Sequence, residues 1–250
     1  MHEERIYTGP VPVLGDPRAG EGTAPGAVFL LADSQPLFAA PLARRLADRI
    51  AAALGPHAPR AAYVGASNGD DPDFYALFLA AVEPLGPAEC RMATAALPDD
   101  ERAFLEAAEL ILLAGGDVER GWRAFEANGT REIVARRHRE GAVVIGVSAG
   151  AVQLGTAGWP EGEPERPFAT WGFAPFVVGA HEEDAGWAGL HAVVAARGDG
   201  AWGVGLPRGG AAVLHGDGSL EALGPPLHEV RAEGGELASA LILPPGDGSV

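Results

Sequence analysis

AVVIGVSAGAVQL, residues 142–154, is the most informative stretch of this 250-residue chain. It begins as a short apolar β-prone run and ends in residues that are compatible with a helix. Between the two lies Gly-X-Ser-X-Gly, centred on Ser148 and flanked by Gly146 and Gly150. A strand that turns sharply into a helix at a serine is the layout of a nucleophile elbow, and its glycines keep side chains out of the turn. We therefore expect Ser148 to be a nucleophile above the edge of a sheet.

The residues around this stretch alternate between apolar runs and amphipathic segments, which predicts parallel βαβ units. Strands are predicted at 28–32, 60–65, 88–93, 110–114 and 142–145, and helices at 36–54, 71–85, 98–109 and 118–139. Asp71 and Pro72 suit the N-cap and first turn of the second helix. Further short strands are predicted at 176–179, 202–206, 211–214, 220–223 and 237–243. The expected fold is a doubly wound, flavodoxin-like, mostly parallel α/β sheet with helices on both faces and a β-rich C-terminal part.

The length of the chain suits one domain with a substantial core. Residues 1–25 are rich in Gly, Pro and charge, so we expect a loose N-terminal arm or an added edge element there. Residues 26–250 show no composition shift that would mark a second domain, and we interpret them as a single α/β domain.

Composition excludes several classes of function. The net charge of −16 argues against nucleic acid and against anionic membranes as partners. The lone cysteine, Cys90, excludes an intrachain disulfide and fits a reducing compartment. The N-terminus is polar and no apolar run reaches membrane-spanning length, so we expect a cytoplasmic protein. The histidines lack the spacing of metal ligands, and no phosphate-loop pattern occurs, so no metal or cofactor is expected.

Polar or Gly-rich turns follow four predicted strands, at 32–35, 65–71, 114–117 and 146–150. Ligands bind at the carboxyl ends of the strands in such sheets. Gly115 and Gly116 would offer backbone N–H groups and leave room for a substrate carbonyl next to Ser148. With the N–H of Ala149, at the start of the following helix, they are predicted to form an oxyanion hole. Three polar residues are expected to bind substrate in the same cleft, the last only from its position on the helix: Asn68, Asp117 and Gln153.

Three motifs together resemble the peptidase E and cyanophycinase family of serine peptidases, family S51. They are GASNGD at 65–70, LLAGGD at 112–117 and GVSAGA at 146–151. The resemblance covers roughly Val28 to Leu214 and is most specific at the second and third motifs. It implies the class I glutamine-amidotransferase-like fold and the activity of a serine peptidase.

The resemblance also implies a general base. The family's histidine follows a short strand beyond the serine, and FVVGAH at 176–181 has that placement, so His181 is the expected base. A serine hydroxyl needs such a base within hydrogen-bond reach. Three histidines are rivals for this role: His191, His215 and His228. Three others are expected at the surface: His2, His57 and His138.

The carboxylate that would orient His181 is the weakest part of the resemblance. Cyanophycinase-like members have a glutamate in a segment that corresponds to GVGLPR at 203–208, which offers none. Peptidase-E-like members resemble one another in carrying the acid in the loop between the serine and the histidine. In this chain, that resemblance favours Glu163 or Glu165. The remaining candidates are Glu161, Glu182, Glu183 and Asp184.

The residues after His181, HEEDAGW at 181–187, are acidic with one aromatic. Cyanophycinases resemble one another in arginines at this place, so cyanophycin is a poor candidate substrate. A ligand with a free amino group or a basic side chain is more consistent with an acidic cleft. We expect a serine hydrolase that cleaves a small peptide or isopeptide by Ser–His acyl transfer, and a homodimer is compatible with the sequence.

Glutamine amidotransferases of this fold carry a cysteine at the elbow. Because Ser148 is there and Cys90 lies on the third predicted strand, that activity is excluded. Two alternatives stay open. One is an α/β-hydrolase-type esterase, whose chain order Ser148, Asp199 and then His215 or His228 would satisfy. The other is a non-catalytic binding relative with a degraded triad, which the missing carboxylate at 203–208 supports.

Overall fold

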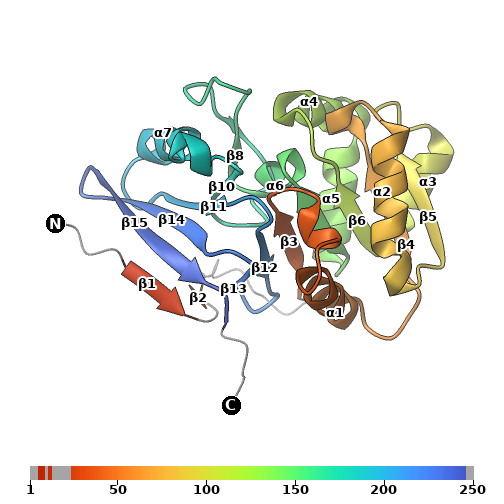
Figure 1. Ribbon diagram of the computed structural model, residues 1–250. Coiled ribbons are helices and arrows are strands. Elements are labelled where there is room, and N and C mark those ends of the chain that lie inside the picture. The colour runs from red at the N-terminus through yellow and green to blue at the C-terminus, as the bar shows by residue number, and fades with distance from the viewer. Residues whose placement is uncertain (1–4, 9–10, 13–23, 246–250) are drawn as a thin grey trace, which may run out of the picture.

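The computed structural model describes residues 5–8, 11–12 and 24–245. An eight-stranded sheet runs through its centre (Figure 1). Its strands are β2 (Val11–Pro12), β3 (Val28–Leu31), β4 (Arg60–Val64), β5 (Glu89–Ala93), β6 (Leu110–Leu113), β7 (Val143–Val147), β12 (Ala211–Leu214) and β13 (Ser219–Leu223). Their order is β2-β13-β12-β3-β7-β6-β4-β5. Strands β3 to β7 are parallel, while β12 pairs with β3 in antiparallel fashion.

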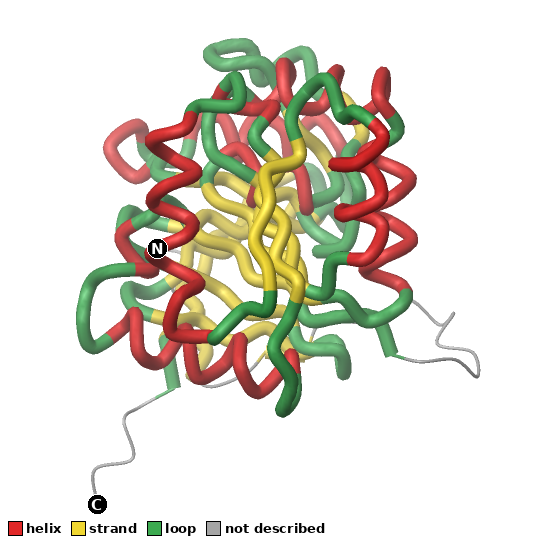
Figure 2. Tube along the Cα trace, turned by 90° about the vertical axis from the view of Figure 1, so that its right-hand side faces the viewer, coloured by secondary structure: helices red, strands yellow, loops and turns green. Residues whose placement is uncertain are grey.

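Helices cover both faces of this sheet, as Figure 2 shows. On one face lie α1 (Leu42–Leu54) and α2 (Pro72–Val82). On the other lie α3 (Asp99–Ala107), α4 (Val118–Asn128), α5 (Thr130–Arg139) and α6 (Ala149–Leu154). Side chains alternate between the two faces along a strand. In β3, Phe29 and Leu31 accordingly belong to the core under α1 and α2, whereas Val28 and Leu30 belong to the core on the opposite face.

A second, five-stranded sheet carries the C-terminal part. Its strands are β1 (Arg5–Thr8), β10 (Val177–Ala180), β11 (Trp202–Leu206), β14 (Leu227–Glu233) and β15 (Glu236–Leu243), in the order β1-β15-β14-β11-β10. Helix α7 (Ala188–Arg197) packs on one face of it through Leu190, Val193 and Val194. In the chain, a small hairpin of β8 (Ala157–Gly158) and β9 (Phe168–Ala169) follows α6 and precedes β10.

The predicted fold class is confirmed, because a mostly parallel central sheet is covered by helices on both faces and strands follow in the C-terminal part. Strands β11 and β12 have the predicted bounds. Asp71 caps α2 as predicted and accepts a hydrogen bond from the Asp73 N–H at 2.8 Å. The helix predicted at 36–54 begins only at Leu42, after a one-turn 3₁₀ helix and Pro41. Neither α7 nor β14 was predicted.

Two pieces of the N-terminal arm lie among the described residues. β1 pairs with β15 in parallel, and β2 pairs with β13 in antiparallel fashion, so both pieces add edge strands. The rest of the predicted arm, at 1–4, 9–10 and 13–23, lies outside the described residues.

Candidate active site

Ser148 stands between β7 and α6, at the carboxyl edge of the central sheet. Its φ of 49° and ψ of −108° are uncommon for a residue with a side chain. The glycines on either side permit the turn. A Cβ on Gly146 would lie 2.5 Å from the Gly150 carbonyl carbon, and a Cβ on Gly150 would lie 2.3 Å from the Leu113 carbonyl oxygen. The crowding expected from the sequence is therefore real, and it comes from neighbouring backbone.

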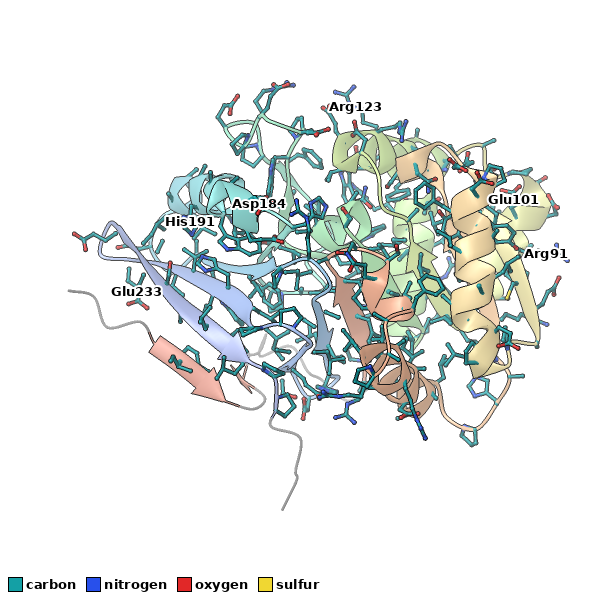
Figure 3. All side chains as sticks on the ribbon, viewed as in Figure 1. Arg91, Glu101, Arg123, Asp184, His191 and Glu233 are labelled. Carbon is teal, nitrogen blue, oxygen red and sulfur yellow. The ribbon has the colours of Figure 1, made fainter. Side chains whose placement is uncertain are left out.

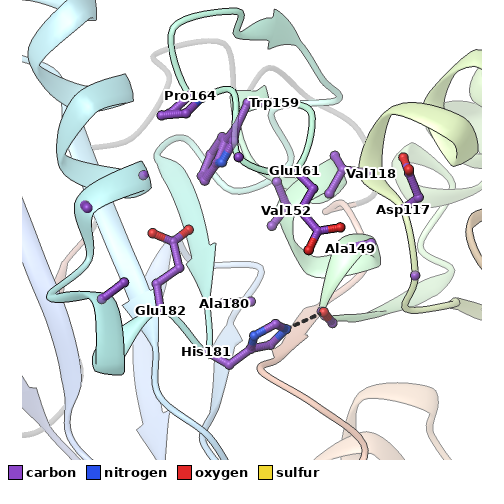
Figure 4. A pocket seen from close by; sticks show the side chains of 16 residues that line it. Asp117, Val118, Ala149, Val152, Trp159, Glu161, Pro164, Ala180, His181 and Glu182 are labelled. Atoms are coloured by element: carbon purple, nitrogen blue, oxygen red, sulfur yellow. Dashed lines mark hydrogen bonds between the residues drawn. The ribbon is translucent and has the colours of Figure 1, made fainter.

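His181 follows β10 and is brought to Ser148 from the other sheet. Its backbone N–H donates to the Leu206 carbonyl at 2.8 Å, which anchors it to β11. Its Nε2 lies 2.8 Å from Ser148 Oγ (Figure 4). For the hydroxyl to donate to Nε2, the neutral imidazole must carry its proton on Nδ1. The pair thus has the geometry of a nucleophile and its base.

Two of the three expected oxyanion donors face the cavity in front of Ser148. Gly116 and Ala149 line it, and the Ala149 N–H has no acceptor within α6 because Ala149 is the first helical residue. Gly115 lines a separate narrow apolar groove instead. A Cβ on Gly116, whose φ is 127°, would meet the Ser67 carbonyl oxygen at 2.2 Å. The expectation that this glycine leaves room for substrate is therefore corrected, because it makes room for backbone.

The cavity in front of Ser148 and His181 has a volume of about 510 Å³, which is within the range of small-ligand sites. Val152 and Trp159 form apolar parts of its wall, while Asp117, Glu161 and Glu182 bring carboxylates to it (Figure 4). A short peptide is of a size that such a cavity can hold.

Comparison with known proteins identifies the family. The sequence model of peptidase family S51 matches residues 29–219. The chain belongs to peptidase family S51. Its members are peptidases, so the chain is a peptidase-like hydrolase by family. No curated protein gave a significant match.

Two solved structures share the S51 chain's fold. A crystal structure of a peptidase from an acI-B1 Actinobacterium has a TM-score of 0.65 and 16% identity, and the match covers 89% of this chain and 96% of that one. The structure of a putative peptidase E protein from Listeria monocytogenes EGD-e has a TM-score of 0.59 and 14% identity, with coverage of 80% and 100%. At this identity the two structures establish the fold alone.

The favoured acids of this S51 protein do not reach the histidine. Among the residues that the structure describes, no carboxylate forms a hydrogen bond with the His181 ring. Glu163 forms an ion pair with Arg166, and Glu165 is exposed and does not line the cavity. The expected hydrogen bond from the His181 ring to one of the candidate acids is therefore not formed.

The acids that follow His181 are engaged elsewhere. Glu183 accepts from the Arg208 N–H at 3.0 Å. The exposed Asp184, which is labelled in Figure 3, forms an ion pair with the Arg208 guanidinium at 2.5 Å. Glu182 accepts from the Leu190 N–H at 3.1 Å. The neighbouring strand offers no substitute, because Ala180 pairs with Leu206, so Pro207 and Arg208 follow next to His181.

Of the three expected substrate-binding residues, only Asp117 lines the cavity. Its carboxylate also caps α4 by accepting from the Arg120 N–H at 2.8 Å. Asn68 is partly buried and donates from Nδ2 to the Tyr63 hydroxyl at 2.7 Å, and burial raises the pKa of this tyrosine to about 12. Gln153 is fully buried, so its expected place in the cleft is corrected.

Gln153 stabilises the scaffold beneath the site. Its Nε2 donates to Ser67 Oγ at 3.1 Å and to the Val118 carbonyl at 2.9 Å. It thereby ties α6 to the turns that follow β4 and β6. A Cβ on Gly121 would lie 2.0 Å from Ser67 Oγ, so this buried contact leaves α4 no room for a side chain.

The rival histidines lie in other contacts. His191 Nε2 is 2.9 Å from His228 Nε2, and the His228 ring stacks on Trp187. Burial first, and His191 second, lower the pKa of His228 to about 4. His215 contacts the Glu221 carboxylate at 3.0 Å. Neither His215 nor His228 is a partner of Ser148, so the esterase arrangement is not assembled.

The surface expectation is wrong for His138 and correct for His57, while His2 lies outside the described residues. His138 is 8% exposed and stacks on Phe173, and its Nε2 lies 2.9 Å from the Gly26 carbonyl oxygen. Helix α5 packs this residue into the core, which a local sequence pattern rich in charge did not reveal.

Within the described ranges, no three His, Cys, Asp or Glu side chains gather as the ligands of a metal ion would. No helix in the described part of the chain is both long and apolar enough to cross a membrane.

Sequence reasoning missed part of the cavity wall. Trp159 and the start of α7, with Ala188 and Gly189, line it. Helix α7 carries a glycine and two adjacent valines, which lower helix propensity. Trp187, the N-cap residue before this helix, has a left-handed φ of 62°.

Proposed function

We propose that this S51 protein is a serine peptidase that cleaves a small peptide or isopeptide through an acyl-enzyme on Ser148. The observation that carries the proposal is the 2.8 Å contact between Ser148 Oγ and His181 Nε2, in the wall of a cavity that Gly116 and Ala149 also line. The backbone of Ser148 supports the nucleophile-elbow interpretation, because Ser148 has a positive φ and lies directly between a strand and a helix.

In the proposed mechanism, His181 Nε2 takes the hydroxyl proton as Ser148 Oγ attacks the substrate carbonyl. The N–H groups of Ala149 and Gly116 stabilise the oxyanion of the tetrahedral intermediate. The carbon–nitrogen bond then breaks, and the imidazolium returns the proton to the leaving amine. Water, activated by the same imidazole, hydrolyses the acyl-enzyme and regenerates the serine.

The absence of an orienting carboxylate among the described residues sets the expected efficiency. A triad acid holds the correct tautomer and stabilises the imidazolium, and its loss costs about 10⁴-fold in the best-studied case. We infer that the site works as a Ser–His dyad whose turnover is slow. Cyanophycin is not the proposed substrate, because the cavity wall carries carboxylates where an aspartate-rich ligand needs cations.

A fluorophosphonate probe tests the proposal, since it labels an activated serine by the same attack. We expect labelling of the native protein at Ser148, detected by mass spectrometry of the modified peptide. Labelling should be lost in Ser148→Ala and strongly reduced in His181→Ala, and it should persist in the matched control His228→Ala. Cleavage of a tripeptide library by the native protein is the second readout. A protein that is neither labelled nor able to cleave would be a non-catalytic binding relative.

A further inference from the structure

The cavity has an acidic wall around a fixed glutamate. Apart from His181, the ionisable side chains that line it are Asp117, Glu161 and Glu182. No arginine is among the described residues of this wall, and the sequence contains no lysine. Figure 4 shows the Glu182 carboxylate on the Trp159 side of the cavity, pointing away from the His181 ring.

Helix α7 holds the Glu182 carboxylate in place. Its Oε2 accepts from the Leu190 N–H at 3.1 Å, in the first turn of the helix. Gly189 provides the space, because a Cβ there would lie 2.9 Å from Oε2 and 3.2 Å from Oε1. The position of the carboxylate is thus set by backbone and does not depend on a flexible partner.

The charge of Glu182 has no cationic partner in the described part of the chain, apart from the electrostatic influence of His181 when that ring is protonated. The next two acids differ, since Arg208 engages both Glu183 and Asp184. Burial, the largest effect, raises the pKa of the Glu182 carboxyl, against the opposing effect of its backbone donors. A cation brought by a ligand would therefore stabilise the ionised form.

We propose that Glu182 is a specificity-determining residue that binds the ammonium or guanidinium group of the substrate, next to the carbonyl that Ser148 attacks. This inference rests on the proposed peptidase function for its substrate class. Two sources supply such a cation: the free amino terminus of a short peptide and a basic side chain. Loss of a charge-assisted hydrogen bond corresponds to about tenfold to hundredfold in kcat/KM.

The test compares wild type with Glu182→Gln, which keeps an acceptor for the Leu190 N–H and removes only the charge. The matched control is Glu83→Gln, an exposed residue on the 3₁₀ turn Glu83–Leu85, outside the cavity. The substrates are tripeptides in which lysine or norleucine occupies each position in turn, each with a free or an acetylated amino terminus. Turnover is measured by mass spectrometry. Binding of the same peptides to Ser148→Ala and to Ser148→Ala/Glu182→Gln is measured by calorimetry.

We expect wild type to prefer cationic over matched neutral peptides by tenfold or more, and Glu182→Gln to reduce that preference to within about threefold. If Glu182 binds the amino terminus, acetylation of that terminus alone abolishes the preference for the peptide. If Glu182 binds a basic side chain, replacement of lysine by norleucine alone abolishes it. An unchanged preference in Glu182→Gln, or an equal loss for all peptides, overturns the inference. If wild type cleaves cationic and neutral peptides equally well, the proposed peptidase function stands and only the role of Glu182 is refuted. If cationic peptides bind preferentially but are not cleaved, the role of Glu182 is supported and the peptidase function is refuted. If the peptides are neither bound nor cleaved, both proposals are refuted.

Discussion

His138 is expected to make the fold sensitive to acid. The imidazole is 8% exposed and contacts Phe173 and the Gly26 carbonyl, and burial lowers its pKa from 6.5 to about 4. In the unfolded chain the ring takes up a proton near pH 6.5, whereas in the folded protein it stays neutral. The stabilising effect is therefore complete above pH 6.5 and is lost as the pH falls through this window towards 4.

The size of the effect follows from the pKa difference. One pKa unit corresponds to about 1.4 kcal/mol, so this shift amounts to about 3 kcal/mol in full and about 2 kcal/mol at pH 5. That is a large part of the free energy of unfolding of a typical domain, which is roughly 5 to 15 kcal/mol. Substitution His138→Gln keeps an N–H donor for Gly26 and removes the titration. The variant loses the stacking on Phe173, so at pH 7.5 it is less stable than wild type.

Urea unfolding at pH 7.5 and pH 5, followed by circular dichroism, measures both proteins. The difference in unfolding free energy between wild type and His138→Gln should shrink by about 2 kcal/mol at the lower pH. Titration of the ring by NMR should show a folded-state pKa near 4. A stability difference that is the same at both pH values, together with a ring that titrates near 6.5, would refute the reasoning.

Three further predictions concern the site. Ser148→Ala should lower turnover by several orders of magnitude with an unchanged urea midpoint, because it removes one partly exposed hydroxyl; retained turnover would exclude Ser148 as the nucleophile. Gly116→Ala should destabilise the fold by about 3 kcal/mol or more, because its Cβ would lie 2.2 Å from a backbone oxygen and its φ is 127°. The control Gly115→Ala should fold normally, because a Cβ there meets only contacts of 3.4 Å and longer. Equal urea midpoints for the two variants would contradict this. Gly189→Ala should displace the Glu182 carboxylate and lower kcat/KM for cationic peptides more than for neutral ones; an equal change for both would argue against a fixed carboxylate.

Local sequence patterns were sufficient wherever the structure depends on a short segment. Apolar runs placed β3, β4, β6 and β7 within a few residues, because a buried parallel strand must be apolar on both faces. The turn at Ser148 was predictable because its glycines are required by contacts within the turn and with β6. The position of His181 after a short strand came from the family resemblance, and the contact with Ser148 supports it.

The third residue of the site could not be decided in this way. Glu163 and Glu165 lie in the predicted loop, yet Glu163 pairs with Arg166, which lies only three residues away, and neither glutamate reaches His181. Likewise, a helix with a glycine and two valines, α7, is stable because its apolar face packs on the second sheet. Propensity alone therefore gave no reason to predict it.

The sequence by itself thus determined the alternation of strands and helices, the turn at Ser148 and the acidic character of the segment after His181. Only the tertiary structure decided the strand order, the burial of His138 and the partner of each carboxylate. The register of β10 with β11 places Pro207 and Arg208 beside His181, and α7 fixes Glu182 in the cavity wall. These outcomes depend on residues far apart in the chain, and their contacts are set by the packing of two sheets, which no local pattern encodes.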